Sequence, residues 1–139
     1  MTKTKKPPAD KAGGTPSDGI NPKDALGLAK VSLSKVPVAA TIYCALAMMD
    51  GAKKYSPFNW RTKKVIASIY VDACKRHLDA WFDGEELASD SGVPHLGHAA
   101  ACIAILIDAI ETGCLHDDRP PPGAAAKLFA RYTVKREAA

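Results

Sequence analysis

The sequence has no apolar run of 18 residues, and its opening residues, MTKTKKPPAD, lack the apolar stretch of a secretory signal. We therefore expect a soluble, intracellular protein that does not enter a membrane. The four cysteines, Cys44, Cys74, Cys102 and Cys114, include no CxxC pair. Because they lie in apolar, helical contexts, we interpret them as small buried side chains.

Lysine and arginine are absent from Asp79 to Asp118, a stretch that contains nine acidic residues. The net charge of +4 comes from the two ends, because residues 21–118 carry twelve acidic residues against ten basic ones. A basic segment, Lys53 to Arg76, precedes the acidic stretch. This division suits a metal-bound, phosphate-bearing ligand better than it suits DNA, which needs an extended basic face, so nucleic acid is not expected as a partner.

Helical periodicity dominates the middle of the chain. Apolar residues recur at helical spacing from Val38 to about Lys53, from about Lys63 to Phe82, and from Pro94 to Gly113, with an acidic loop from Asp83 to Val93. No strand is evident. The sequence predicts an all-α fold, a small helical bundle of three long helices with a short helix near the C-terminus.

The ends differ from this middle in composition. We predict a disordered basic tail over residues 1–20, one domain over residues 21–118, and a Pro-rich spacer with a basic segment over residues 119–139. The third helix is apolar nearly all round from Ala99 to Ile110, so it should lie at the centre of the core or in a subunit interface. We expect the bundle to pair with copies of itself as a homo-oligomer, a dimer or tetramer.

The turn GAKKYSPFNWR, Gly51 to Arg61, combines cations with aromatic rings. Lysine and arginine side chains hold phosphate oxygens, flat rings can cover a base, and an amide can bind its edge. The alternative is a solvated turn whose aromatic side chains cap the core. The candidates for substrate binding are Lys53, Lys54, Tyr55, Asn59, Trp60, Arg61, Arg76 and His77.

The stretch from Arg76 to His98 gathers three histidines and five carboxylates. Carboxylates are the ligands that Mg²⁺ prefers, and two histidines at i and i+3 suit one metal or one ligand and one proton-handling group. The alternative for the acids is a solvated face, which we assign to Asp79. The candidate catalytic residues are Glu85, Glu86, His95 and His98, and the candidate metal ligands are Asp83, Glu85, Glu86, Asp90 and His98.

Three blocks in this order resemble one known family: GAKKYSPFNWR, RHLDAWFDGEE and DSGVPHLGHAAACIAILID. They are similar to the phage dATP/dGTP diphosphohydrolases, which include the MazZ-type enzymes and are related to the MazG-like all-α nucleotide pyrophosphohydrolases. The resemblance covers about residues 21–112. The chain departs from the family pattern at Ser56, where glycine is usual, at Glu86 and Ala88, where aspartate is usual, and at Asp90, where glutamate is usual.

The resemblance implies hydrolysis of a purine deoxynucleoside triphosphate, dGTP or dATP, to the monophosphate and pyrophosphate with Mg²⁺ or Mn²⁺. It also implies a phage setting in the host cytoplasm, where dGMP supplies 2-aminoadenine nucleotide synthesis. The metal site of the MazG-like enzymes resembles EExxE followed by ExxD. Glu85-Glu86 matches the beginning of this motif. Two segments are candidates for its second half, His95xxHis98 and Asp108xxGlu111.

Two other functions compete with this hypothesis. A histidine–aspartate metal phosphohydrolase would use His77, His95 or His98 with His116-Asp117 and would release triphosphate or phosphate. A non-catalytic nucleotide or nucleic-acid binding module would use the basic tails, and its DNA binding would weaken with salt and vanish without them.

Overall fold

The computed structural model describes Gly19 and residues 21–134. The tail predicted for residues 1–20 lies outside the described residues except for Gly19. Contacts divide the chain into two units, Met1–Lys35 and Val36–Ala139, and each is described by itself. The described part of the first unit contains α1 (Pro22–Leu28) and a short 3-10 turn, η1 (Leu33–Lys35).

The short helix α1 has a local start signal. The Asn21 side chain accepts a hydrogen bond from the backbone N–H of Lys23 at 3.0 Å, and Pro22 occupies the first helical position. Both are features that favour a helix N-terminus, because they satisfy or remove N–H groups that have no partner within the helix. The bundle predicted from the sequence did not count this helix separately.

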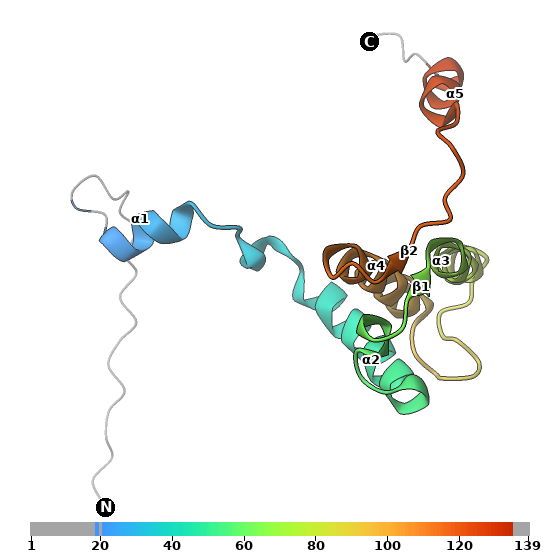
Figure 1. Cartoon of the computed structure of the whole chain (residues 1–139), viewed down its shortest axis with the longest axis horizontal. Coiled ribbons are helices and arrows are strands. Elements are labelled where there is room, and N and C mark those ends of the chain that lie inside the picture. Colours follow the sequence, from blue (N-terminus) through green and yellow to red (C-terminus); the bar gives the residue numbers. More distant parts are fainter. Residues whose placement is uncertain (1–18, 20, 135–139) are drawn as a thin grey trace, which may run out of the picture. The chain divides into compact units, whose positions relative to one another are not determined.

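The second unit contains the predicted bundle. Its elements are α2 (Val38–Tyr55), η2 (Asn59–Arg61), β1 (Val65–Ile66), α3 (Ala67–Phe82), α4 (His95–Glu111), β2 (Leu115–His116) and α5 (Ala125–Tyr132). The all-α fold is therefore confirmed, with three long helices and a short one near the C-terminus. Figure 1 shows α4 beside α2 and α3, and both of these helices pack against it.

Small residues allow α4 to approach α2 closely. A Cβ atom added to Gly97 would lie 2.5 Å from the backbone oxygen of Tyr43, so no larger residue fits there without a shift of one helix. Ala47 on α2 and Ala101 on α4 are also buried. The central position expected for the third helix thus depends on glycine and alanine at the crossing.

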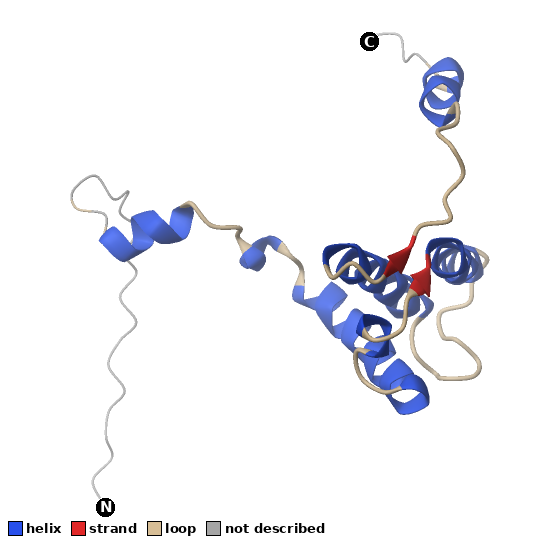
Figure 2. Cartoon of the chain, in the orientation of Figure 1, coloured by secondary structure: helices blue, strands red, loops and turns tan. Residues whose placement is uncertain are grey.

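Two strands of two residues each join the start of α3 to the end of α4. Val65 pairs with Leu115 and Ile66 with His116 in parallel register, and Figure 2 shows the strands side by side. The sequence gives no signal for strands this short, because their pairing depends on where α3 and α4 are placed. Buried Val65 belongs to the core with Trp60 and Ala109.

One face of α4 is uncovered in the single chain. Ile103, Ile107 and Ile110 are each about half exposed, at 48%, 57% and 57%. The sequence of α4 is apolar nearly all round, and this face is a part of it that α2 and α3 do not cover. Among the described helices, none combines the length and the apolar character needed to cross a membrane.

Candidate active site

A cavity of about 590 Å³ opens between the three long helices of the second unit. Its size falls within the usual range for a small-molecule site. The residues that line it are Ala47, Met48, Asp50, Gly51, Ala52, Lys54, Tyr55, Ser56, Pro57, Phe58, Asn59, Trp60, Tyr70, Ala73, His77, Asp90, His98, Ala101, Cys102 and Ile105. All three sequence blocks thus contribute to one cavity.

Helical spacing brings side chains of α3 and α4 to the cavity. Tyr70 and His77 lie seven residues apart on α3, and His98 and Ile105 lie seven apart on α4. Residues at this separation lie on the same face of a helix, two turns apart. Each of the two helices therefore lines the cavity with one histidine and one largely apolar side chain on the same helix face.

Two carboxylates lie on either side of one ammonium group in this cavity. The Nζ atom of Lys54 is 2.8 Å from an Asp50 oxygen and 3.7 Å from an Asp90 oxygen. Asp50 and Lys54 are four residues apart on α2, whereas Asp90 comes from the loop before α4. The hydrogen bond from Lys54 to Asp50 is the main cause that raises the pKa of the lysine.

The connection from α2 to η2 bends sharply at two residues with positive φ. Ser56 has φ 72° and ψ 152°, and Phe58 has φ 55° and ψ 26°. The conformation of Ser56 is one that glycine adopts almost exclusively, because a Cβ atom is strained there. Glycine at this position would avoid that strain.

Replacing Ser56 by glycine should therefore stabilise the protein. Backbone strain of about 1–3 kcal/mol is relieved, and the larger conformational freedom of glycine in the unfolded chain offsets about 0.5–1 kcal/mol of this gain. We expect the free energy of unfolding, measured by urea denaturation, to rise by about 1 kcal/mol. Ser56→Ala is the control, since it removes the hydroxyl but keeps the Cβ atom; an equal gain in both variants would refute the strain argument.

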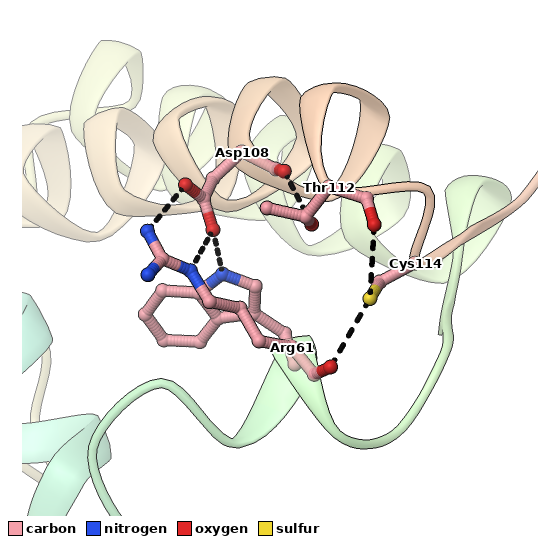
Figure 3. A network of polar contacts seen from close by, with 5 residues as sticks. Arg61, Asp108, Thr112 and Cys114 are labelled. Atoms are coloured by element: carbon pink, nitrogen blue, oxygen red, sulfur yellow. Dashed lines mark hydrogen bonds and ion pairs between the residues drawn. The ribbon is translucent and has the colours of Figure 1, made fainter.

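A second charged network holds the turn onto α4 (Figure 3). Asp108 accepts hydrogen bonds from Arg61 Nε and Nη2, both at 2.8 Å, and from Trp60 Nε1 at 2.6 Å. These donors favour the ionised carboxylate and hold the pKa of Asp108 at about 2, with the bond from Arg61 as the largest cause. Arg61 also places its cation over the Phe58 ring, 4.6 Å from the centroid.

Three histidines form a cluster beside the carboxylates. The Nδ1 atoms of His77 and His95 are 2.9 Å apart, and the His77 ring stacks on His98 with centroids 4.5 Å apart. His98 Nε2 is 2.8 Å from the Ser91 hydroxyl. Burial is the main cause that lowers the pKa of both His77 and His98, which favours their neutral rings.

The structure divides the candidate residues into two groups. Those that line the cavity are Lys54, Tyr55, Asn59, Trp60, His77, Asp90 and His98. Those that do not line it are Lys53, Arg61, Arg76, Asp83, Glu85, Glu86 and His95. The roles assigned to both groups stay predictions, but only the first group lies where a ligand in this cavity would touch it.

Several residues outside the lining have other contacts. Arg61 is paired with Asp108 as described, and His95 is 93% buried and lies 3.3 Å from a Glu85 oxygen through its Nε2 atom. The backbone oxygen of Glu86 accepts a hydrogen bond from the His95 N–H at 3.0 Å. Asp83 is exposed at the C-terminal end of α3.

Asp50 is a charged cavity residue that the sequence reasoning missed. Its position four residues before Lys54 predicts that both side chains lie on one helix face, so the spacing alone could have found it. Tyr70 was also missed, and it had no signal beyond its place in an apolar helix. Its hydroxyl has a pKa raised mainly by burial.

In the part of the chain that the structure describes, no three histidine, cysteine or carboxylate side chains are gathered closely enough to hold a metal ion by themselves. Asp50 and Asp90 nevertheless provide two hard oxygen donors on either side of a cation. Mg²⁺ is commonly bound by one or two carboxylates together with substrate phosphates and waters. The two carboxylates are therefore donors of the type that Mg²⁺ or Mn²⁺ takes together with substrate phosphates.

The comparisons with known proteins agree with the three sequence blocks. The family model described as dATP/dGTP diphosphohydrolase, N-terminal, matches residues 20–119, which include every residue that lines the cavity. No curated protein and no solved structure matches the chain.

Proposed function

The chain belongs to the dATP/dGTP diphosphohydrolase family and is therefore a nucleotide pyrophosphohydrolase; from this premise we propose that its cavity binds dGTP in preference to dATP and that hydrolysis requires Mg²⁺ or Mn²⁺. The products are the deoxynucleoside monophosphate and pyrophosphate. The observation that carries the proposal is the single cavity that contains both the Asp50–Lys54–Asp90 group and several aromatic side chains.

The cavity offers suitable partners for both parts of a nucleotide. Tyr55, Phe58, Trp60 and Tyr70 supply flat apolar surface for a base, and the Asn59 amide supplies one donor and one acceptor for its edge. An amide of this kind suits guanine and adenine alike. The preference for dGTP therefore depends on the resemblance of the sequence blocks to the dGTP-acting members of the family.

The carboxylate pair and Lys54 would bind the triphosphate and its metal ion. Asp50 and Asp90 would hold the metal ion, whose chemistry is to neutralise phosphate charge and to activate a water molecule. Lys54 would donate charge-assisted hydrogen bonds to phosphate oxygens. Its ammonium already makes a contact of this kind to Asp50. Burial lowers the pKa of His98, and the charges of Asp50 and Asp90 partly oppose this effect, so His98 belongs to the same polar group.

The product analysis tests this proposal. Purified protein with Mg²⁺ or Mn²⁺ should convert dGTP to dGMP and pyrophosphate in equal amounts, with a higher kcat/KM than for dATP, and chelation of the metal should stop turnover. Release of orthophosphate or triphosphate would instead indicate the histidine–aspartate phosphohydrolase. That alternative requires Asp117, which does not line the cavity and pairs with Arg119 at 2.7 Å, so Asp117→Ala should leave pyrophosphate release largely intact.

We further propose that the chain assembles as a homo-oligomer in the cytoplasm of a phage-infected host, where its dGMP would supply 2-aminoadenine nucleotide synthesis. The half-exposed isoleucines Ile103, Ile107 and Ile110 support the assembly, because an uncovered apolar face of this kind is typical of an interface. Light scattering of the purified protein would give the number of subunits.

A further inference from the structure

The contacts between Glu85, His95 and His77 permit one arrangement of protons when both rings are neutral. An ionised carboxylate can only accept hydrogen bonds, so the 3.3 Å contact between Glu85 Oε2 and His95 Nε2 requires a proton on that nitrogen. A neutral imidazole carries one proton, and His95 Nδ1 is then bare. His95 is 93% buried, so it keeps these two partners rather than water.

The bare nitrogen of His95 determines the tautomer of the next ring. The Nδ1 atoms of His95 and His77 are 2.9 Å apart, and one of the two must donate. Because His95 Nδ1 has no proton, His77 donates its Nδ1–H. The Nε2 atom of neutral His77 then has a free lone pair, and it makes no hydrogen bond to any other described residue.

The position of His77 makes this lone pair available to a ligand. His77 lines the cavity, whereas Glu85 and His95 do not. Its ring is stacked on His98 at an interplanar angle of 14°, which restricts rotation of the ring plane. The carboxylate Asp90 and the ring of His98 line the same cavity, so His77 shares it with groups proposed to bind the triphosphate.

We propose that Glu85, His95 and His77 form a hydrogen-bonded chain that presents the unprotonated Nε2 atom of His77 to the cavity, where it accepts a hydrogen bond from the attacking water. The proposal rests on the function proposed above. His77 is then a catalytic residue that orients a lone pair of the water toward the α-phosphorus. His95 and Glu85 are positioning residues that keep His77 in the required tautomer.

The tautomer can be measured without substrate. In ¹⁵N NMR spectra of the full chain at neutral pH, His77 should show a protonated Nδ1 and a bare Nε2, with its signals assigned by their absence from His77→Gln. Glu85→Ala should shift His77 toward the Nε2–H tautomer. Asp79→Ala is the matched control, because Asp79 is an exposed carboxylate on α3 outside the cavity lining, and it should leave the His77 signals unchanged.

Kinetics then test the role of the nitrogen. Glu85→Ala should lower kcat for dGTP about 10- to 100-fold with little change in KM, as expected when a partner that orients a reacting group is lost. His77→Ala should lower kcat about 100-fold. His77→Gln should recover part of this loss, because its amide oxygen can accept a hydrogen bond in place of Nε2. Asp79→Ala should retain the wild-type kcat.

Distinct outcomes would overturn each part. An Nε2–H tautomer of His77 in the wild-type protein would refute the chain whatever the activity. A normal kcat in His77→Ala, or a kcat in Glu85→Ala that falls while the His77 tautomer stays unchanged, would refute the catalytic role. A wild-type protein with the expected spectrum that hydrolyses no purine deoxynucleotide would refute the proposed function, and the role of the water with it.

Discussion

Replacing Asp50 by asparagine should reduce kcat/KM for dGTP by at least about 100-fold, which is the upper end of the loss seen when an outer partner of a metal site is removed. The reason is that Asp50 supplies one of the two carboxylates in the cavity, and an amide is a weaker donor to Mg²⁺ than a carboxylate. Steady-state kinetics over a range of Mg²⁺ concentrations should show a raised requirement for metal as well as a lower maximal rate.

Two comparisons make the result for Asp50 specific. Asp79→Asn removes the same charge from an exposed site on α3 and should retain wild-type kinetics. Asp90→Asn should resemble Asp50→Asn, since both carboxylates contact Lys54. Wild-type activity in Asp50→Asn at limiting Mg²⁺ would contradict the proposed metal site.

Replacing Trp60 by alanine should lower the free energy of unfolding by about 3–5 kcal/mol, the usual cost for a large buried aromatic side chain. Trp60 is only 9% exposed and packs in the core with Val65 and Ala109. Its indole N–H also donates to Asp108, so truncation removes both packing and a hydrogen bond to a charged group. Urea denaturation followed by far-UV circular dichroism measures the loss without depending on tryptophan fluorescence.

The variant Trp60→Phe separates the two contributions. It keeps an aromatic ring in the core but removes the donor to Asp108, so the loss should be clearly smaller than that of Trp60→Ala. A loss in Trp60→Ala below about 1 kcal/mol, within the range of ordinary surface substitutions, would show that this residue serves the ligand alone. Trp60 caps the core and also lines the cavity, and its role in substrate binding stays a prediction.

The long helices could be predicted because their signals are local. Apolar spacing, Pro94 and Gly113 placed the helices within a few residues of their observed limits, since a helix depends on residues three and four apart. The motif blocks likewise indicated the family. The strand pair at Val65 and Leu115 had no such signal, because it exists only once α3 and α4 are packed.

The assignments within the site show the same limit. Lys54 and Arg61 belong to one block and have similar chemistry, yet Lys54 lies in the cavity and Arg61 pairs with Asp108 on α4. His95 and His98 share one turn of α4, yet only His98 lines the cavity. Residue type and spacing support both members of each pair equally, since they do not show which neighbour a side chain meets.

The amino-acid sequence by itself determined the helices, the composition of the turn and the family, because each depends on residues close together in the chain. The tertiary structure decided which charges face one another. Asp50 meets Asp90 across Lys54, and Glu85 meets His77 through His95, only because α2 and α3 pack on α4. Contacts between residues far apart in sequence depend on that packing, and the site is made of such contacts.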